Sequence, residues 1–370
     1  MESCRLPLEL CEEVMNALLK RHELPLDITT PSRYWFHQQQ ALCACALTCR
    51  AWRVRAQHLL LKFPHIRNSQ CLASVTTAIQ QLRDISIVHG LVLDSDGMLD
   101  LSTAGGLFMS ALPHLQHLTY VNTRFDRGPP LRLLRMRLPF FAGITVLRLH
   151  LCTFQSLRSM LDVVWACRNV VSFHMRGCTL QTQRHSPAAI KAACEHLRPC
   201  QKLTRLEFLQ VGLTTLAGSM FGAAVTELVI AKARNAEFLS NLLAKSFPAL
   251  RSITVIDMRD ERLPYMDNNT PSWLHAIAAS RAVPGGLKKI VLRRHHVLKY
   301  NKCCREVVGS SMAVVGTSKP LSELLSGLEE LTIGGFPVQG VSKTKGKSCN
   351  PAYIKLVIPT TMHTILRFEN

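Results

Sequence analysis

One spacing of apolar residues recurs along most of the 370-residue chain and constrains its fold more than any other feature. An apolar residue at a position n is followed by two more, at n+3 and n+5. These two share one face of a strand, because successive side chains alternate, so each occurrence predicts a strand with one buried face. Repetition at intervals of 22 to 41 residues indicates an array of similar units. The nine occurrences have n at Val88, Leu115, Ile144, Val170, Leu203, Val225, Leu250, Leu287 and Leu328.

Positions n+2 and n+4 point away from that buried face, and most of them hold polar residues. We therefore expect each strand to bury one face and to display the other at the surface. The polar positions are His117 and Thr119, Ser172 and His174, Arg205 and Glu207, Ser252 and Thr254, Lys289, and Glu330 and Thr332. The apolar exceptions are Val92, Val146, Val229 and Val291.

Segments between several of these strands have helical spacing, with apolar residues three and four apart at 157–165, 190–197 and 238–243. Strands and helices that alternate over a short period predict parallel strands joined by right-handed crossovers, and hence an α/β fold. Residues 354–358 and 364–368 alternate between apolar and polar, and they predict a terminal strand or cap.

Two repeats continue with a cysteine three residues after position n+5. Cys152 follows Leu149, and Cys178 follows Met175. Both segments match Leu-x-x-Leu-x-Leu-x-x-Asn/Cys, and residues 64–370 resemble a leucine-rich-repeat solenoid with a polar loop at 340–351. Other repeats depart from the motif at this position, so we expect an irregular solenoid. We interpret both cysteines as buried turn residues, with a redox role as the alternative.

The first sixty residues have helical spacing instead. Pro7 suits a first helical turn, since its missing N–H costs nothing there. A first apolar stripe contains Leu10, Cys11, Val14, Met15, Leu18 and Leu19, and a second contains Leu42, Cys45, Ala46, Cys49, Trp52 and Ala56. The second helix is expected to continue to residue 63. Two such helices cannot bury both stripes against each other, so they need a partner or a following domain.

The sequence of these helices resembles that of a known module. Leu6-Pro7-Leu8-Glu9-Leu10, and then Ala41 to Trp52 ending in Cys49-Arg50-Ala51-Trp52, resemble the F-box, the docking module of cullin–RING ubiquitin ligase receptors. The sequence from Ala41 to Trp52 is most similar to the F-box families of basidiomycete fungi. We predict this module at residues 1–63, with an insert at 21–40 where most F-boxes have a short turn. The alternative is an ordinary helical hairpin that caps the solenoid.

The resemblance implies a substrate-recognition subunit that docks a Skp-type adaptor, and through it a cullin, and has no catalytic activity of its own. It implies adaptor contacts from Leu6, Pro7, Leu8, Leu10, Val14, Leu18, Leu42, Cys45, Cys49 and Trp52. Trp52 is the expected anchor, with inward packing on the first repeat as its competing use. The polar face of the solenoid would bind an unknown protein client, with candidate contacts at His117, His174, Arg205, Lys289, Arg293 and Arg294.

The charge balance leaves a second function open. The chain has 44 Lys and Arg against 25 Asp and Glu, a net charge of +19, and such an excess attracts polyanions or acidic protein surfaces. The densest basic run is Lys288, Lys289, Arg293, Arg294, Lys299, Lys302 and Arg305. It is interpreted as a nucleic-acid contact, a receptor for an acidic segment, or a solvated flank. Nucleic acid is the weakest of the three, because only Tyr300 offers a stacking ring within the run.

No catalytic or cofactor-binding motif is found. His-Glu-x-x-His, Gly-x-Ser-x-Gly and Gly-x-Gly-x-x-Gly are absent. The stretch from Gly340 to Ser348 has one residue too many for a phosphate-binding loop, and Pro351 opposes the helix that should follow. The adjacent His295 and His296 point to opposite faces of a strand. The 14 cysteines lack zinc-site spacing, so we expect no metal and no cofactor.

The expected location is the cytoplasm or the nucleus. Met1 is followed by an acidic residue and an amphipathic helix rather than by a signal peptide. Unpaired cysteines fit a reducing compartment. Two uncharged stretches, 101–123 and 208–226, fall inside the repeat, and we interpret them as parts of it rather than as membrane spans.

Overall fold

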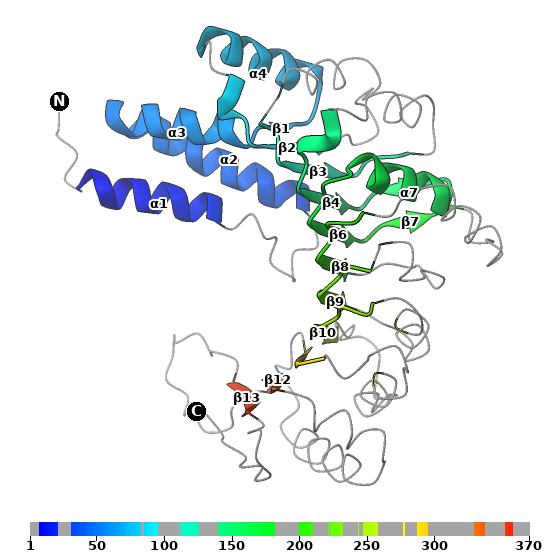
Figure 1. Cartoon of the computed structure of the whole chain (residues 1–370). Coiled ribbons are helices and arrows are strands. Elements are labelled where there is room, and N and C mark those ends of the chain that lie inside the picture. The colour runs from blue at the N-terminus through cyan, green and yellow to red at the C-terminus, as the bar shows by residue number, and fades with distance from the viewer. Residues whose placement is uncertain are drawn as a thin grey trace. The chain divides into compact units, whose positions relative to one another are not determined.

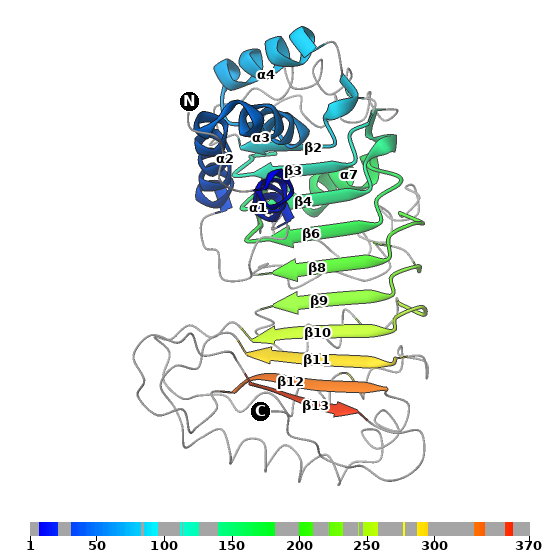
Figure 2. The same cartoon turned by 90° about the vertical axis from the view of Figure 1, so that its left-hand side faces the viewer.

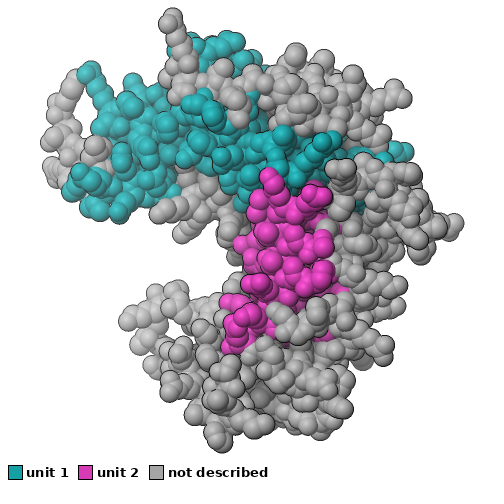
Figure 3. Space-filling model, viewed as in Figure 1, with its two compact units in different colours: residues 1–170, 175–184 teal, residues 171–174, 185–370 magenta. Residues whose placement is uncertain are grey.

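The computed structural model describes residues 7–20, 31–82, 85–94, 112, 114–125, 140–181, 200–209, 221, 223–231, 243, 247–257, 277, 287–294, 329–336 and 352–357. The chain is an α/β protein with a mainly parallel sheet and several helices near its N-terminus. It divides into two compact units, residues 1–170 with 175–184 and residues 171–174 with 185–370 (Figure 3).

Three helices open the first unit: α1 (Leu8–Lys20), α2 (Pro31–Thr48) and α3 (Arg50–Lys62). The first matches the predicted helix. The expected single helix from residue 42 to 63 was wrong, because Cys49 has extended backbone angles (φ −156°, ψ 169°) and separates α2 from α3. The Thr48 hydroxyl donates to the carbonyl of Cys45 at 2.8 Å and so satisfies an end carbonyl of α2. Residues 31–40 of the predicted insert belong to α2.

A fourth helix, α4 (Ser69–Leu82), was not predicted from the sequence. Its N-terminus is capped by Asn68, whose Oδ1 accepts the backbone N–H of Cys71 at 2.8 Å. Leu72 and Ile79, seven residues apart, are its buried side chains. Two short 3₁₀ helices, η1 (Ile85–Ile87) and η3 (Phe140–Gly143), lie ahead of strands in the same unit.

All nine repeats place their n+3 and n+5 residues in strands, which confirms the strand prediction. The first unit has β1 (His65–Ile66), β2 (Gly90–Asp94), β3 (His117–Val121) and β4 (Val146–His150), and β6 (Ser172–Arg176) has residues in both units. The second unit has β8 (Arg205–Leu209), β9 (Glu227–Ala231), β10 (Ser252–Asp257), β11 (Lys289–Arg294), β12 (Glu330–Phe336) and β13 (Ala352–Val357). Within each unit the strands lie side by side in the order of the sequence (Figures 1 and 2).

The pairing of these strands follows the repeat. In the first unit Leu91, Leu118 and Leu147, all at position n+3, are partners in consecutive parallel strands. In the second unit Leu206, Leu228, Ile253, Ile290 and Leu331 are aligned in the same way. Strand β13 matches the predicted terminal strand at 354–358 and pairs antiparallel with β12. The second part of that prediction, 364–368, lies outside the described residues, as do the predicted helix at 190–197 and all of 238–243 except Leu243.

A row of backbone carbonyls at position n+1 joins successive repeats, and we call it the carbonyl ladder. The carbonyl of Val171 accepts the N–H groups of Thr204 and Arg205 at 2.9 and 3.0 Å. The carbonyl of Thr204 in turn accepts from Thr226 and Glu227, both at 2.9 Å. Threonine hydroxyls add a third donor, as Thr204 Oγ1 does to the Val171 carbonyl at 3.3 Å. Each ladder carbonyl thereby fixes where the next strand begins.

The chain turns sharply after three strands of the first unit. Asn122, Leu151 and Gly177, each directly after a strand, have φ of 52°, 54° and 61°. Short strands β5 (Thr153–Phe154) and β7 (Thr179–Leu180) follow two of these turns and pair in parallel. Helix α7 (Leu157–Ala166) follows β5, and its N-terminus carries a capping box of Ser156 and Ser159. This confirms the helix predicted at 157–165.

Replacing Gly177 by alanine is expected to lower the free energy of unfolding by about 1–2 kcal/mol, because an L-residue is strained at φ 61°. An added Cβ would also lie 2.6 Å from Leu151 Cδ2, although that methyl group can move aside. Urea unfolding of the two proteins measures the change. Gly143→Ala is the control, since Gly143 is exposed and has no positive φ. Equal losses for the two variants would contradict the prediction.

The sequence predicts that the polar face is exposed on every strand, but in the structure part of this face is buried. Thr119 and Arg148, both at position n+4, are 2% and 9% exposed. The two views place α1, α2 and α3 on the side of β2 to β4 opposite α7 (Figures 1 and 2). Phe63, just after α3, packs against His117, with ring centroids 5.9 Å apart. The N-terminal helices therefore cover part of the face that the repeat alone leaves open.

Candidate functional site

The three N-terminal helices form a small apolar core of their own. Cys11 and Met15 of α1, Leu42 of α2, and Ala56 and Leu59 of α3 are all buried in it. Around it pack the partly buried side chains of Leu18, Cys45, Ala46, Trp52, Leu60 and Phe63. One side of the apolar stripe of α1 is therefore buried by the chain itself.

A second apolar side of α1 stays exposed. Leu10 and Val14, one helical turn apart on the same face, are 48% and 50% exposed, and Pro7 before them is exposed as well. We call these three residues the exposed α1 edge. The same unit exposes Phe36, Leu47 and Val54 on α2 and α3. Large apolar side chains left in water on a helix mark a surface suited to contact with another protein.

The predicted adaptor contacts fall into different environments. Pro7, Leu10 and Val14 are exposed and can reach another chain. Leu42 is only 2% exposed and packs in the helical core, because helical spacing does not tell which part of the stripe faces the other helices. The half-buried positions are Leu18, Cys45, Cys49 and Trp52. Leu6 and the side chain of Leu8 lie outside the described residues.

Trp52 is half-buried and packs against the core of the three helices. Its indole Nε1 is buried and has no hydrogen-bond partner within the described part of the chain. A buried donor without an acceptor costs about 1–3 kcal/mol, and the indole ring usually finds one when it is buried. The ring stabilises the fold of the helices, and its N–H remains unsatisfied there.

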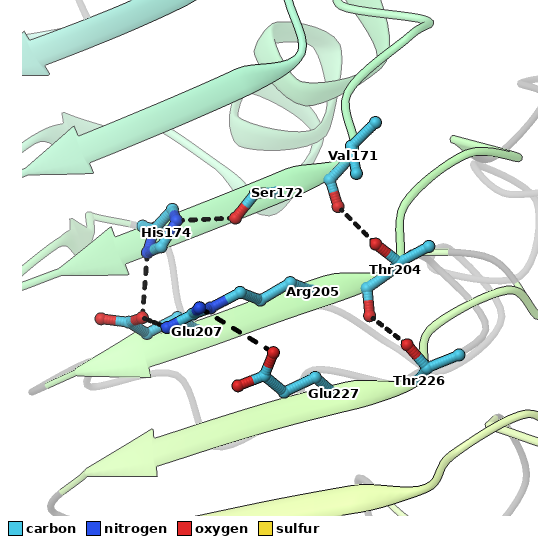
Figure 4. A network of polar contacts seen from close by, with 8 residues as sticks. All are labelled: Val171, Ser172, His174, Thr204, Arg205, Glu207, Thr226 and Glu227. Atoms are coloured by element: carbon cyan, nitrogen blue, oxygen red, sulfur yellow. Dashed lines mark hydrogen bonds and ion pairs between the residues drawn. The ribbon is translucent and has the colours of Figure 1, made fainter. Parts of the chain in front are cut away.

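A network of polar side chains lies on the polar face of β6, β8 and β9 (Figure 4). Ser172 Oγ lies 2.7 Å from His174 Nε2, and His174 Nδ1 lies 2.9 Å from Glu207 Oε2. Arg205 Nη2 lies 3.5 Å from the same Glu207 oxygen, and Arg205 Nη1 lies 3.9 Å from Glu227 Oε2. The network thus joins one histidine, one arginine and two carboxylates within the second unit.

The predicted client contacts are only partly brought together. His174 and Arg205 share the network, whereas His117 packs on Phe63 in the first unit. Lys289 is half-buried, and the side chains of Arg293 and Arg294 lie outside the described residues. The sequence placed Ser172 and Glu207 on the polar face without a role, and Glu227 was missed. The signal that finds the two glutamates is charge opposite to that of Arg205 at positions n+2 and n+4 of the same and the next repeat.

Cys152 and Cys178 are buried turn residues, as predicted. Their thiols lie within 3.4–3.6 Å of backbone carbonyls, including those of Tyr120 and Leu149. Burial raises the pKa of the Cys152 thiol well above its usual value, and contact with Cys178 raises it further. A thiol that stays protonated and out of solvent is a poor redox group, so the structure speaks against the alternative role.

Within the described residues, no three His, Cys, Asp or Glu side chains gather as metal ligands would. None of the described helices combines the length and the apolar character needed to cross a bilayer. The stretches Gly340–Ser348 and His295–His296 lie outside the described residues. Comparison with protein-family models finds no match for this chain, and comparison with curated proteins finds no relative.

Proposed function

We propose that this chain is the substrate-recognition subunit of an SCF-type cullin–RING ubiquitin ligase, acting in the cytoplasm or the nucleus. Residues 1–63 would be an F-box that docks a Skp-type adaptor, and residues 64–370 an irregular leucine-rich-repeat-like solenoid that holds a protein client. The single observation that carries the proposal is the exposed α1 edge, which lies in the segment whose wording resembles the F-box.

Docking through this edge is favoured by the area it would remove from water. Full burial of a leucine or valine side chain stabilises by about 1.5–3 kcal/mol, and Leu10 and Val14 still keep about half of their surface to bury. The core beneath them needs no partner, so the helices can present the edge already folded. A preformed surface loses less conformational freedom on binding.

The solenoid part of the proposal is supported by the regularity of the strands. Consecutive strands pair in parallel with the same repeat positions opposite each other, and the carbonyl ladder recurs from β2 to β4 in the first unit and from β6 to β12 in the second. Cys152 and Cys178 are buried at the position where the leucine-rich-repeat motif has Asn or Cys. Within the ligase the chain does not itself transfer ubiquitin: it raises the effective concentration of its client near the charged ubiquitin carrier.

Charge at the described strands bears on the kind of client. Among the n+2 and n+4 side chains that the structure describes on β8 to β11, two are basic, Arg205 and Lys289, and two are acidic, Glu207 and Glu227. This described part of the face is neutral, although the whole chain carries +19. The client surface that fits it has mixed charge rather than a run of acidic residues.

The test is co-purification of the full chain with a recombinant Skp-type adaptor. Leu10→Arg with Val14→Arg puts two charges on the exposed α1 edge and is expected to weaken capture by about 30-fold or more, the effect of losing a hot spot. Ala73→Arg, an exposed alanine on α4, is the matched control and should leave capture unchanged. Circular dichroism checks that both variants stay folded. Undiminished capture by the double variant would refute adaptor docking through this edge.

The excess of positive charge favours one alternative: a basic solenoid scaffold that binds nucleic acid or acidic proteins without ligase assembly. It expects affinity for a DNA or RNA oligonucleotide that falls steeply with salt, and no adaptor in the complex. Titration of a labelled oligonucleotide at two salt concentrations separates it from the first proposal.

A further inference from the structure

Three side chains of the second unit are hydrogen-bonded in series: Ser172, His174 and Glu207 (Figure 4). A carboxylate can only accept hydrogen bonds, so Glu207 fixes the proton of the neutral imidazole on Nδ1. Nε2 then keeps its lone pair and faces the Ser172 hydroxyl at 2.7 Å. This is the order of contacts by which a base activates a nucleophilic oxygen.

The strands hold this series in place. Ser172 and His174 are two residues apart on β6 and therefore share its polar face, and Glu207 comes from β8. His174 is only 9% exposed and is bonded at both ring nitrogens, so its ring has little freedom to rotate. Ser172 is half-buried and keeps part of its surface open to solvent.

Arg205 lies on β8, the strand next to β6 in the sheet. It occupies the same repeat position as Ser172, and its N–H bonds to the Val171 carbonyl at 3.0 Å. Its side-chain Nε is buried with no hydrogen-bond partner among the residues that the structure describes, and its contacts to Glu207 and Glu227, at 3.5 and 3.9 Å, are longer than a good N–H···O bond. A guanidinium with unused donors can stabilise negative charge that develops on a neighbouring oxygen.

We propose that Ser172 is an activated nucleophile that attacks the carbonyl of small esters, an activity beyond client binding and independent of the adaptor. Its Oγ lone pair forms a bond to the carbonyl carbon while its proton passes to His174 Nε2. Arg205 stabilises the oxyanion. The bond to the leaving alkoxide then breaks, His174 returns the proton to it, and water later releases the acid by the same steps. Glu207 is a positioning residue, because it acts through His174.

An alkyl fluorophosphonate is the probe, with intact-mass measurement of the full chain. Ser172 Oγ displaces fluoride from phosphorus, and the wild-type protein is expected to gain a single adduct. Ser172→Ala should gain none. Ser252→Ala is the matched control, because Ser252 occupies the same repeat position on β10 with Thr254 in place of the histidine, and it should label like the wild type. His174→Gln should slow labelling by about 10²–10⁴-fold.

Glu207→Gln separates positioning from simple support of the fold. The amide can donate to Nδ1, which allows the tautomer with the proton on Nε2, and that nitrogen cannot then accept from Ser172. Labelling should slow, and its dependence on pH should change, while thermal unfolding shows that the variant is folded. If His174→Gln does not fold, Glu207→Gln still tests whether the histidine acts as the base. The proposal is overturned if the wild type gains no adduct, or if it labels no faster than Ser172→Ala or Glu207→Gln.

Discussion

Phe154→Ala is expected to lower the free energy of unfolding by about 3–5 kcal/mol, the cost of removing a large ring from a closed core. Phe154 is fully buried on β5. Its ring stacks on that of Phe125, with centroids 4.8 Å apart and planes within 2°, and Phe125 in turn meets Tyr120 edge-on at 5.3 Å. Removing the Phe154 ring leaves Phe125 without the surface on which it stacks.

Chemical denaturation of the full chain measures this loss, and Phe36→Ala is the control. Phe36 is 36% exposed, and Arg67 lies over its ring at 4.2 Å, so we expect a loss of about 0.5–1 kcal/mol from that contact. If both phenylalanines cost the same, the ring stack around Phe154 does not stabilise the protein in the way described.

Gly90→Ala has the second largest expected effect. A Cβ at Gly90 would lie 2.3 Å from Phe63 Cδ1 and 3.2 Å from the Cβ of His117. The strand cannot move without breaking its pairing with β3, so the Phe63 ring must leave its position. Overpacking of this kind costs about 1–3 kcal/mol, and it loosens the contact between α3 and the sheet of the first unit.

A double-mutant cycle tests the mechanism. Phe63→Ala removes the ring that the new methyl group displaces, so Gly90→Ala should cost much less in that background, with a coupling of about 1–2 kcal/mol. Urea unfolding of the wild type, both single variants and the double variant supplies the four values. Additive losses would show that Phe63 is not what the methyl group displaces.

The strands could be predicted because their signal is local and repeated. Positions n+3 and n+5 define a face within five residues, and register follows because the same positions pair in the next repeat. The break between α2 and α3 at Cys49 could not be predicted, because apolar residues continue at steps of three and four from Leu42 to Ala56. Helix α4 was missed because its centre holds Val75, Thr76 and Thr77, which favour strands over helices.

The candidate sites were only half visible for a different reason. Spacing gives the faces of one element, whereas the face that remains free depends on what packs against it. Leu10 and Leu42 both belong to an apolar stripe in the sequence, yet Leu10 is exposed and Leu42 is buried. Ser172 and His174 stood out as polar strand residues, but their bond to Glu207 depends on a strand that starts 33 residues further on.

The carbonyl ladder also explains how the chain tolerates such uneven spacing between strands. The His89 carbonyl accepts the N–H groups of residues 116 and 117 at 2.8 and 3.0 Å, and the Arg251 carbonyl accepts those of residues 288 and 289 at 2.9 Å. The two crossovers differ by ten residues and end in the same geometry. A connecting segment of any length can follow one strand and end at the next acceptor carbonyl without changing the alignment of the strands. Insertions and grafted peptides in these connecting segments should therefore be absorbed locally, and the connecting segments are the natural places to diversify the protein by engineering.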